Sequence, residues 1–392
     1  MKQQRPLVEA LQRFVRNEPH SLHVPGHKNG IFSTLPNELK AAMQYDVTEL
    51  TGLDDFHHPE GAIKEAETLL AKVYKADRSF FLVNGSTVGN LAMIYATCEA
   101  GDTILVQRNA HKSIFHALEL VGVNPVYLAP EWHETSLTAG HVSTETIKEA
   151  IKRYPHAKAV VLTYPTYYGV ATEQLTEQII YCHEAGIPVL VDEARGAHLI
   201  ASHYLPSSAL MLGADVVVQS AHKTLPAMTM ASFMHVKSSL VDVEKVNHYL
   251  RMLQSSSPSY LLLASLDDAR AYIADYTEID FAAFMDKRAH FIESVRAIDG
   301  LEIVEVDDSL KLLLRAPGYT GFQLKDVLEA HHVYSELADR EQVLFILPLM
   351  KQGQIYPFAD IRLRIKESMV ALTKKPAEPY LPTKGLAVPS IM

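Results

Sequence analysis

Seven short apolar runs alternate with longer segments of helical period between about residues 60 and 240. This alternation constrains the fold most strongly, because strands that alternate with helices form a parallel sheet covered by helices on both faces. The runs are apolar almost throughout, which is typical of strands buried on both faces. The predicted strands are SFFLV (79–83), TILVQ (103–107), PVYLA (125–129), AVVLT (159–163), PVLVD (188–192), DVVVQ (215–219) and ASFMHV (231–236).

The segments between and after these strands predict helices and a second domain. Capping residues and helical period predict helices over residues 86–99, 112–121, 143–154 and 172–185. Residues 238–300 are mostly helical in pattern, and shorter α/β units follow from residue 301. We therefore expect an N-terminal arm with a short amphipathic helix (1–45), a large domain (46–275), a small C-terminal α/β domain (276–375) and a proline-rich extended tail (376–392).

Composition excludes several classes of function. The 392 residues, 48% of them hydrophobic, are enough for two packed domains. A net charge of −10 without basic clusters argues against nucleic-acid binding. Charges interrupt every apolar run of the N-terminus, which predicts neither a signal peptide nor a membrane span. The two cysteines, Cys98 and Cys182, lie in helix-like segments, so we expect no disulfide framework and a cytoplasmic location.

Polar clusters follow three of the predicted strands. Asp192 ends one strand and continues into EARGAH, the run Ser220-Ala221-His222-Lys223 follows another, and Gly85-Ser86-Thr87 follows the first and begins a helix. Ligands of open parallel sheets bind beyond the carboxyl ends of the strands, so we expect these clusters to share one edge of the sheet.

Each cluster has a chemical interpretation and a structural one. The glycine turn at a helix N-terminus can bind an anion such as phosphate, or it can simply cap the helix. Lys223, at the end of a buried strand, can lose solvation and act as an amine nucleophile, or it can reach the surface. Asp192 can pair with a ring nitrogen or serve as a structural carboxylate. Taken together, an anion-binding turn, a carboxylate and a desolvated lysine are the minimum set for pyridoxal phosphate.

From about residue 20 to 270 the sequence resembles the fold-type-I, aspartate aminotransferase-like, pyridoxal phosphate-dependent ornithine/lysine/arginine decarboxylases, and in particular their Gram-positive arginine decarboxylase-like branch. The segments that carry the resemblance are HVPGHK (23–28), ELTGLDDFHHPEGAIKEA (49–66), FFLVNGSTVGN (80–90), GDTILVQRNAHKS (101–113), YPTYYGV (164–170), VLVDEARGAH (189–198), GADVVVQSAHKTL (213–225) and SSSPSYLLLASLDDAR (255–270).

The resemblance implies a role for individual residues. Lys223 is expected to form the Schiff base, and Asp192 to pair with the pyridine nitrogen. His111 is expected to stack on the ring, with Ala194 and Arg195 beside it and Arg195 near the ring hydroxyl. The expected phosphate ligands are Gly85, Ser86, Thr87, Ser220 and His222. Catalysis is expected to involve Lys223, His222, Asp192 and His111, and the serines of 255–259 are expected to approach the phosphate of a neighbouring subunit in a homodimer or higher oligomer.

Three positions depart from the family pattern. Arg195 stands where histidine is common, Ala221 where threonine is usual and Met230 where glutamine is usual. The arginine adds a permanent cation that can compete with a cationic substrate. The chain also ends at VPSIM, where family members are expected to continue, so we expect either a shorter branch or a truncated form.

The resemblance implies decarboxylation of arginine, lysine or ornithine to a di- or polyamine. Two alternatives stay open: an aminotransferase or lyase on the same fold, and a catalytically silent paralogue that acts as a binding or regulatory subunit. A cationic substrate needs acidic partners, and the candidates are Asp54, Asp55 and Glu60 or Glu336 and Asp339. The pairs His57-His58 and His331-His332 lack the spacing of a zinc motif, so no metal is expected.

Overall fold

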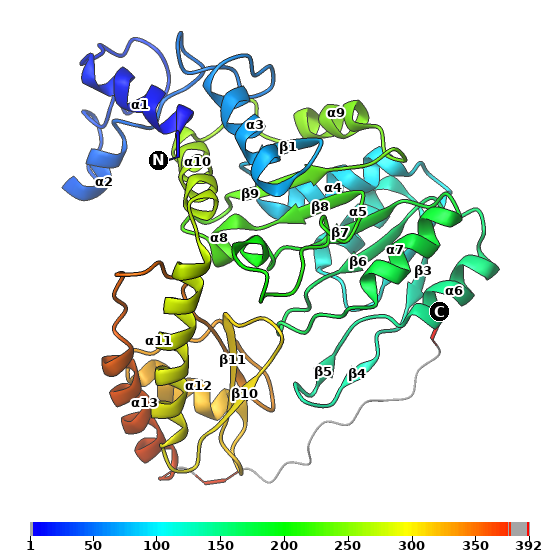
Figure 1. Ribbon diagram of the computed structural model, residues 1–392. Coiled ribbons are helices and arrows are strands. Elements are labelled where there is room, and N and C mark those ends of the chain that lie inside the picture. Colours follow the sequence, from blue (N-terminus) through cyan, green and yellow to red (C-terminus); the bar gives the residue numbers. More distant parts are fainter. Residues whose placement is uncertain (1–2, 375, 378–389, 392) are drawn as a thin grey trace.

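A seven-stranded sheet forms the centre of the molecule (Figure 1). The computed structural model describes residues 3–374, 376–377 and 390–391. All seven predicted strands are present within about one residue of their expected bounds, in the spatial order β1-β9-β8-β7-β6-β2-β3. Only β9 runs antiparallel to its neighbours in this sheet. The strands are β1 (Arg78–Leu82), β2 (Thr103–Gln107), β3 (Asn124–Leu128), β6 (Val160–Thr163), β7 (Val189–Asp192), β8 (Val216–Gln219) and β9 (Ser232–Val236).

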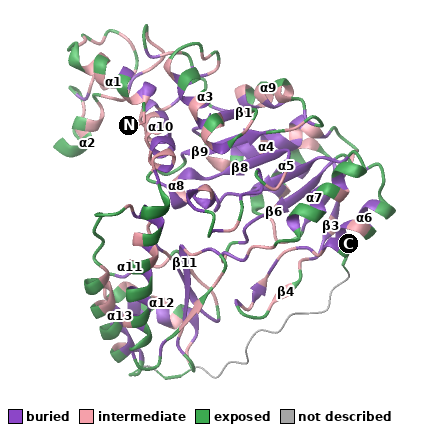
Figure 2. Ribbon diagram, in the orientation of Figure 1, coloured by how far each residue is buried: buried purple, intermediate pink, exposed green. Residues whose placement is uncertain are grey.

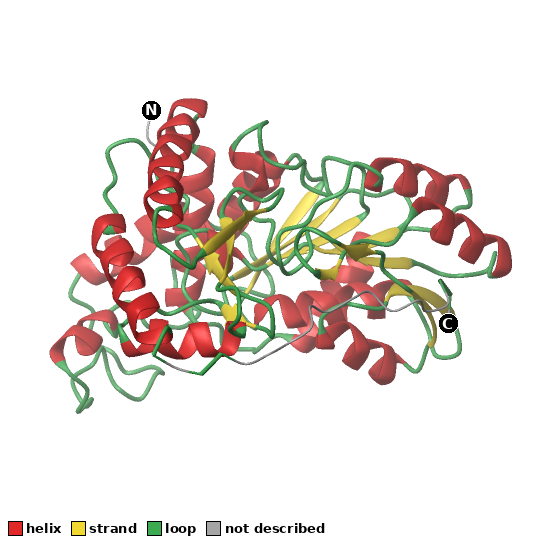
Figure 3. Cartoon of the chain, turned by 90° about the horizontal axis from the view of Figure 1, so that it is seen from below, coloured by secondary structure: helices red, strands yellow, loops and turns green. Residues whose placement is uncertain are grey.

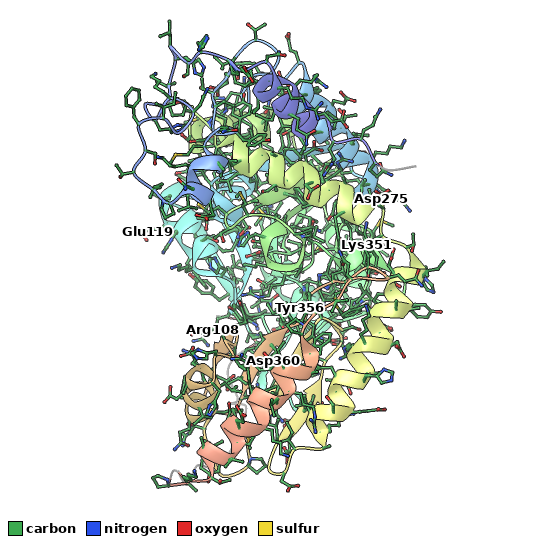
Figure 4. All side chains as sticks on the ribbon, turned by 90° about the vertical axis from the view of Figure 1, so that its left-hand side faces the viewer. Arg108, Glu119, Asp275, Lys351, Tyr356 and Asp360 are labelled. Atoms are coloured by element: carbon green, nitrogen blue, oxygen red, sulfur yellow. The ribbon has the colours of Figure 1, made fainter. Side chains whose placement is uncertain are left out.

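Helices cover both faces of the sheet (Figure 3), and the strands between them are buried (Figure 2). Successive residues of a strand point to opposite faces. Val216 and Val218 accordingly pack into one hydrophobic cluster and Val217 into the other. The first cluster includes residues of α4 (Gly85–Thr97), α5 (Lys112–Val121) and α9 (Val243–Leu253). The second includes residues of α3 (Ala62–Tyr74), α6 (Thr144–Arg153), α7 (Leu175–Glu184) and α10 (Tyr260–Ala274).

The sequence pattern did not predict the smallest elements of the fold. The hairpin β4 (Trp132–His133) and β5 (Thr138–Ala139) was not predicted, because two-residue strands are too short to show a period. The structure also contains α8 (Ala221–Thr224) and a 3₁₀ turn (Leu199–Ala201). Both cysteines are buried free thiols.

The N-terminal segment packs against the large sheet domain through one helix. In α1 (Pro6–Arg16), Leu7 and Leu11 are fully buried, and the backbone N–H of Leu7 donates to the buried carboxylate of Asp267 in α10 at 3.0 Å. Residues 18–45 include α2 (Asn37–Ala42) and leave Leu22, Ile31 and Phe32 exposed. Among the described residues, no helix is long and apolar enough to span a membrane.

A second, antiparallel sheet lies in residues 278–372, which we call the small domain. Its strand order is β10-β11-β13-β12, and three helices accompany it. The elements are α11 (Glu278–Arg296), β10 (Glu302–Glu305), β11 (Lys311–Arg315), α12 (Gly321–Ala330), β12 (Leu337–Ala338), β13 (Val343–Ile346) and α13 (Phe358–Leu372). Most of the predicted tail lies outside the described residues; Ile391 forms an isolated antiparallel bridge with Leu128 of β3.

Candidate active site

The three polar clusters meet at one edge of the large sheet. β7 and β8 are parallel, and β1 and β8 both run antiparallel to β9, so the carboxyl ends of β1, β7 and β8 lie at the same edge. Ser220, after β8, donates a hydrogen bond from Oγ to the Oγ of Ser86, after β1, at 2.8 Å. Residues 134 positions apart in the chain are thereby joined directly.

The glycine turn after β1 leaves the start of α4 open to a ligand. Gly85 has a φ of +78°, a conformation that favours glycine. The N-cap residue Asn84 makes no side-chain cap, and its Oδ1 instead accepts from the backbone N–H of Ser255 at 3.2 Å. Helix α8 also begins without a side-chain cap. Two uncapped helix starts therefore meet at Ser86 and Ser220, which suits an anion, and Thr87 is exposed on the first turn of α4.

Asp192 is buried at the end of β7 and points toward α4. Its side chain is on the same face of the sheet as that of Leu190, which packs in the cluster containing α4. One carboxylate oxygen accepts from Asn90 Nδ2 at 2.9 Å, and the other accepts from the backbone N–H of Ala194 at 3.1 Å. These two donors hold the carboxylate in a fixed orientation.

A chain of hydrogen bonds joins Asp192 to His111. Nδ2 of Asn90 donates both to Asp192 and to Ser113 Oγ, each at 2.9 Å. Ser113 Oγ lies 2.8 Å from His111 Nδ1, which also accepts from the backbone N–H of Ser113 at 3.2 Å. Burial lowers the pKa of His111, although the charge of Asp192 opposes this effect. The imidazole is therefore neutral, with its remaining proton on Nε2.

Lys223 and His222 line a cavity of about 770 Å³ that extends to the small domain. Burial, followed by the charge of Arg195, lowers the pKa of Lys223 to about 8, while Asp192 and Glu336 act in the opposite direction. Burial also lowers the pKa of His222, and its Nδ1–H donates to the carbonyl of Ala231 at 3.0 Å. A fraction of Lys223, about a tenth at pH 7 and about half at pH 8, is thus the neutral amine. The lowered pKa of His222 favours the form in which Nε2 is unprotonated.

Arg195 lies over an aromatic ring close to these groups. Its guanidinium carbon is 3.1 Å from the centroid of the Tyr167 ring, and its Nη2 is 3.7 Å from a carboxylate oxygen of Glu336. Tyr167 Oη donates to that same oxygen at 2.9 Å. The Nε of Arg195 is buried without a hydrogen-bond partner among the described residues. The other two departures from the family pattern flank Lys223 in the chain: Ala221 is fully buried, and Met230 has a φ of +80°.

Only one of the five acidic candidates lines the cavity with Lys223, and it is Glu336. Asp54 instead accepts from the backbone N–H groups of residues 60, 61, 63 and 64 and so holds the start of α3. Asp55 accepts from the backbone of both His57 and His58. Asp339 accepts from Tyr168 Oη and from two backbone N–H groups of its own turn.

Across residues 3–374, 376–377 and 390–391, no group of three or more histidine, cysteine, aspartate or glutamate side chains is arranged to hold a metal ion.

Sequence reasoning missed Asn90, Ser113 and Tyr167. Asn90 is four residues after Ser86 on the same helix, so the two share one helix face, and this spacing was a usable signal. Glu193 was also missed. It is fully buried, burial raises its pKa to about 8, and it accepts from Ser208, Gln219 and the backbone of Ala209. These contacts anchor the chain directly after Asp192.

The residues present fit pyridoxal phosphate. Lys223 offers an amine of lowered pKa for the aldehyde, Asp192 a fixed carboxylate for the ring nitrogen, and the starts of α4 and α8 an anion site for the phosphate. The unpartnered Nε of Arg195 is a buried donor that an oxygen of the ring can satisfy.

Comparison with known proteins identifies a family of amino-acid decarboxylases that this chain resembles. Residues 5–312 match the family model described as Orn/Lys/Arg decarboxylase, major domain. Protein YaaO of Bacillus subtilis (strain 168), described as uncharacterized, is 50% identical over 355 residues, which are 88% of this chain and 74% of YaaO. The arginine decarboxylase of Halalkalibacterium halodurans is 34% identical over 366 residues, which are 88% of this chain and 74% of that protein.

A solved structure shows the same fold. The lysine decarboxylase LdcF of Francisella novicida superposes with a TM-score of 0.78 at 24% identity, over 94% of this chain. The chain spans 60% of the length of that structure. The predicted fold-type-I architecture is thereby confirmed. On the family match and the relatives above, the chain belongs to the Orn/Lys/Arg decarboxylase family, whose members use pyridoxal phosphate.

Proposed function

We propose that this protein decarboxylates a basic amino acid, namely arginine, lysine or ornithine, and releases carbon dioxide and a di- or polyamine in the cytoplasm. One observation carries the proposal. Lys223, with its lowered pKa, lines a cavity of about 770 Å³ in which Glu336 is the only carboxylate among the described lining residues. An amine nucleophile at one place and a single anion at another suit an amino acid with a cationic side chain.

In this proposal each residue has a defined task. Pyridoxal phosphate, when bound, accepts the electron pair left when the bond to the α-carboxylate breaks. Lys223 Nζ attaches the coenzyme covalently, and Ser86, Thr87, Ser220 and the uncapped starts of α4 and α8 bind its phosphate. Asp192, held by Asn90 and Ala194, would keep a proton on the ring nitrogen, and His111 would cover the ring. The unpartnered Arg195 Nε would donate to the ring oxygen and so favour its ionised form.

The proton that replaces the carboxylate needs a donor in the cavity. Lys223 Nζ and the His222 ring are the two candidates, because both side chains line the cavity. Lys223 can donate from its amine directly, whereas His222 must first take up a proton at Nε2. Glu336 binds the distal cation of the substrate, and Tyr167 Oη orients that carboxylate at 2.9 Å.

We also propose a homodimer that shares its active sites. The supporting observations are the exposed Leu22, Ile31 and Phe32 in residues 18–45 and the contact of Ser255 with the glycine turn through Asn84. Sedimentation of the purified protein tests the assembly, since a monomer at micromolar concentration would contradict it.

The activity is tested with a mixture of carboxyl-labelled arginine, lysine and ornithine. We expect labelled carbon dioxide and one matching amine by mass spectrometry, and loss of both in Lys223→Ala. The exposed Lys237→Ala is the matched control. Keto acid or eliminated product would instead indicate an aminotransferase or lyase. Absence of any product, together with failure of borohydride to fix the coenzyme, would indicate a silent paralogue.

A further inference from the structure

Arg195 occupies a place that has the chemistry of a cation subsite. An aromatic face and a carboxylate are the two groups that bind guanidinium and ammonium ions in proteins. Tyr167 supplies the face, at 3.1 Å from the guanidinium carbon, and Glu336 supplies the carboxylate. The two come from distant parts of the chain, the loop after β6 and the segment before β12, and the hydrogen bond from Tyr167 Oη to Glu336 joins them.

The guanidinium is stacked closely but poorly paired. Its 3.7 Å separation from Glu336 is longer than a charge-assisted hydrogen bond, and its buried Nε has no partner among the described residues. The Arg195 side chain is 10% exposed, whereas that of Glu336 is 34% exposed. Glu336 also lines the cavity that contains Lys223. The carboxylate is therefore open to a ligand in the cavity while it is shared with an internal cation.

We propose that Arg195 is a specificity-determining residue that competes with the distal cation of a substrate for Tyr167 and Glu336. The inference rests on the proposed function, because it assumes that substrate enters the cavity of Lys223. Arg195 is a fixed positive charge that already stacks on Tyr167 and partly neutralises Glu336. It therefore weakens the binding of guanidinium and ammonium side chains relative to neutral side chains of the same shape.

The test uses two amines that differ only at the distal group and carry no carboxylate to lose. Agmatine has a guanidinium, and N-carbamoylputrescine has a neutral ureido group of the same shape. Calorimetric titration of the coenzyme-loaded protein measures both dissociation constants, and the absorbance of the bound coenzyme gives a second readout that needs no turnover. In Arg195→Gln we expect the affinity for agmatine to rise about tenfold relative to the affinity for N-carbamoylputrescine, equivalent to about 1.4 kcal/mol. The ratio is used because any change of Arg195 at the coenzyme affects both amines alike.

Two further variants separate charge from shape. Arg195→Lys keeps the charge, so agmatine is expected to remain weakly bound. Glu336→Gln removes the carboxylate, so agmatine is expected to bind more weakly than to the wild type while the neutral amine is unaffected. If Arg195→Gln fails to fold, Arg195→His, which introduces the residue common in the family, replaces it. Agmatine binding equally to wild type, Arg195→Gln and Arg195→His would overturn the inference.

The outcomes distinguish this inference from the proposed function. If the wild type releases carbon dioxide from a basic amino acid but the ratio of the two dissociation constants is the same in Arg195→Gln, the decarboxylase proposal survives and the role of Arg195 is refuted. If no basic amino acid is decarboxylated but the ratio shifts as expected, the cation subsite survives and the decarboxylase proposal fails.

Discussion

The amine of Lys223 is surrounded by opposing charges. Burial is the largest cause that lowers the pKa of Lys223, and the charge of Arg195 lowers it further. The charges of Asp192 and Glu336 raise it, and the resulting pKa is about 8, compared with an ordinary value of 10.5. Only the neutral amine attacks an aldehyde. The rate at which coenzyme attaches to the coenzyme-free protein should therefore rise with pH, reach half of its maximum near pH 8 and level off about one pH unit above that midpoint.

The neighbouring charges move this midpoint in opposite directions. Arg195→Gln removes a cation that lowers the pKa of Lys223, so its midpoint should move to higher pH. Glu336→Gln removes an anion that raises it, so its midpoint should move to lower pH. Stopped-flow absorbance measures the attachment rate of the wild type and the two variants between pH 6 and pH 10. This range extends about two units on each side of the Lys223 pKa. Identical midpoints would show that these charges do not reach the amine.

Asn90 is a positioning residue whose two amide protons hold Asp192 and Ser113. In Asn90→Leu, an apolar side chain of similar size removes a buried hydrogen bond to a carboxylate. We expect the kcat/KM for carbon dioxide release to fall about ten- to a hundredfold. The absorbance of the bound coenzyme should also titrate at a different pH, which a purely structural role would not cause.

Asn124→Leu is the matched control for Asn90→Leu. Asn124 also donates from Nδ2 to an oxygen, the carbonyl of Gly101 at 2.7 Å, but it lies at the first residue of β3, at the opposite edge of the sheet. It should leave the coenzyme absorbance unchanged. Equal titration of the coenzyme in wild type and Asn90→Leu would contradict the role assigned to Asn90.

At the scale of elements, α4 is positioned by close contact with the sheet at Gly89. A Cβ at this position would lie 2.7 Å from Val218 Cγ1 and 2.8 Å from Leu82 Cδ1, closer than atoms can pack. In Gly89→Ala we expect overpacking to outweigh the gain in helix propensity, with a net loss of about 1–2 kcal/mol of unfolding free energy. The displaced α4 also carries Ser86 and Asn90, so coenzyme affinity should fall with the melting temperature.

A compensating variant tests this packing argument. Val218→Ala removes two of the three methyl groups that the new Cβ would meet, and the methyl group of Leu82 remains. Gly89→Ala with Val218→Ala should therefore lose less stability than the sum of the single variants. Gly26→Ala is the control, because its Cβ would meet nothing within 4 Å. A wild-type melting temperature for Gly89→Ala would show that α4 has room to move.

At the scale of the whole molecule, a buried ionic cluster joins the small domain to the large sheet. Asp308 accepts from His198 Nε2 at 2.9 Å and pairs with Lys311, and all three side chains are fully buried. Burial acts to raise the pKa of Asp308, but His198 and Lys311 outweigh it and hold the pKa well below its ordinary value. The cluster therefore stabilises the folded protein above about pH 4, and its contribution is lost as the pH falls below that value.

Removal of one partner should cost more than removal of two. Asp308→Asn leaves the buried ammonium of Lys311 without an anion, so we expect a loss of about 3–5 kcal/mol of unfolding free energy. Adding Lys311→Met replaces that ammonium with an apolar side chain and should recover part of the loss. Thermal melting of the single and double variants measures both effects. If the double variant melts below Asp308→Asn, the cluster is not held together by charge pairing.

Sequence patterns predicted the sheet well because its signal is local. Each of the seven strands is a run of apolar residues that shows itself without reference to the rest of the chain. The predicted strand ends also pointed to Asp192, Lys223 and the glycine turn as candidate site residues, because each lies at or just after the end of an apolar run in the sequence. The four-residue spacing of Ser86 and Asn90 contained the signal for Asn90, but it is meaningful only once the face of α4 that meets β7 is known.

The choice among the acidic candidates had no local signal. Asp54 and Glu336 are both carboxylates in polar loops, and nothing in their neighbouring residues separates them. In the structure Asp54 is saturated by backbone N–H groups at the start of α3, whereas Glu336 lines the cavity with Lys223. Which carboxylate faces the cavity depends on how the small domain packs against the large one.

The amino-acid sequence by itself determined the layered fold, and it predicted the amine, the carboxylate and the anion-binding turn of the proposed site, because hydrophobic period and strand ends are properties of short segments. Only the tertiary structure decided which groups meet: Asn90 with Asp192, Arg195 with Tyr167 and Glu336, and His198 with Asp308. The physical reason is that hydrogen bonds and charge interactions depend on distances of a few ångströms between residues that can be more than a hundred positions apart in the chain.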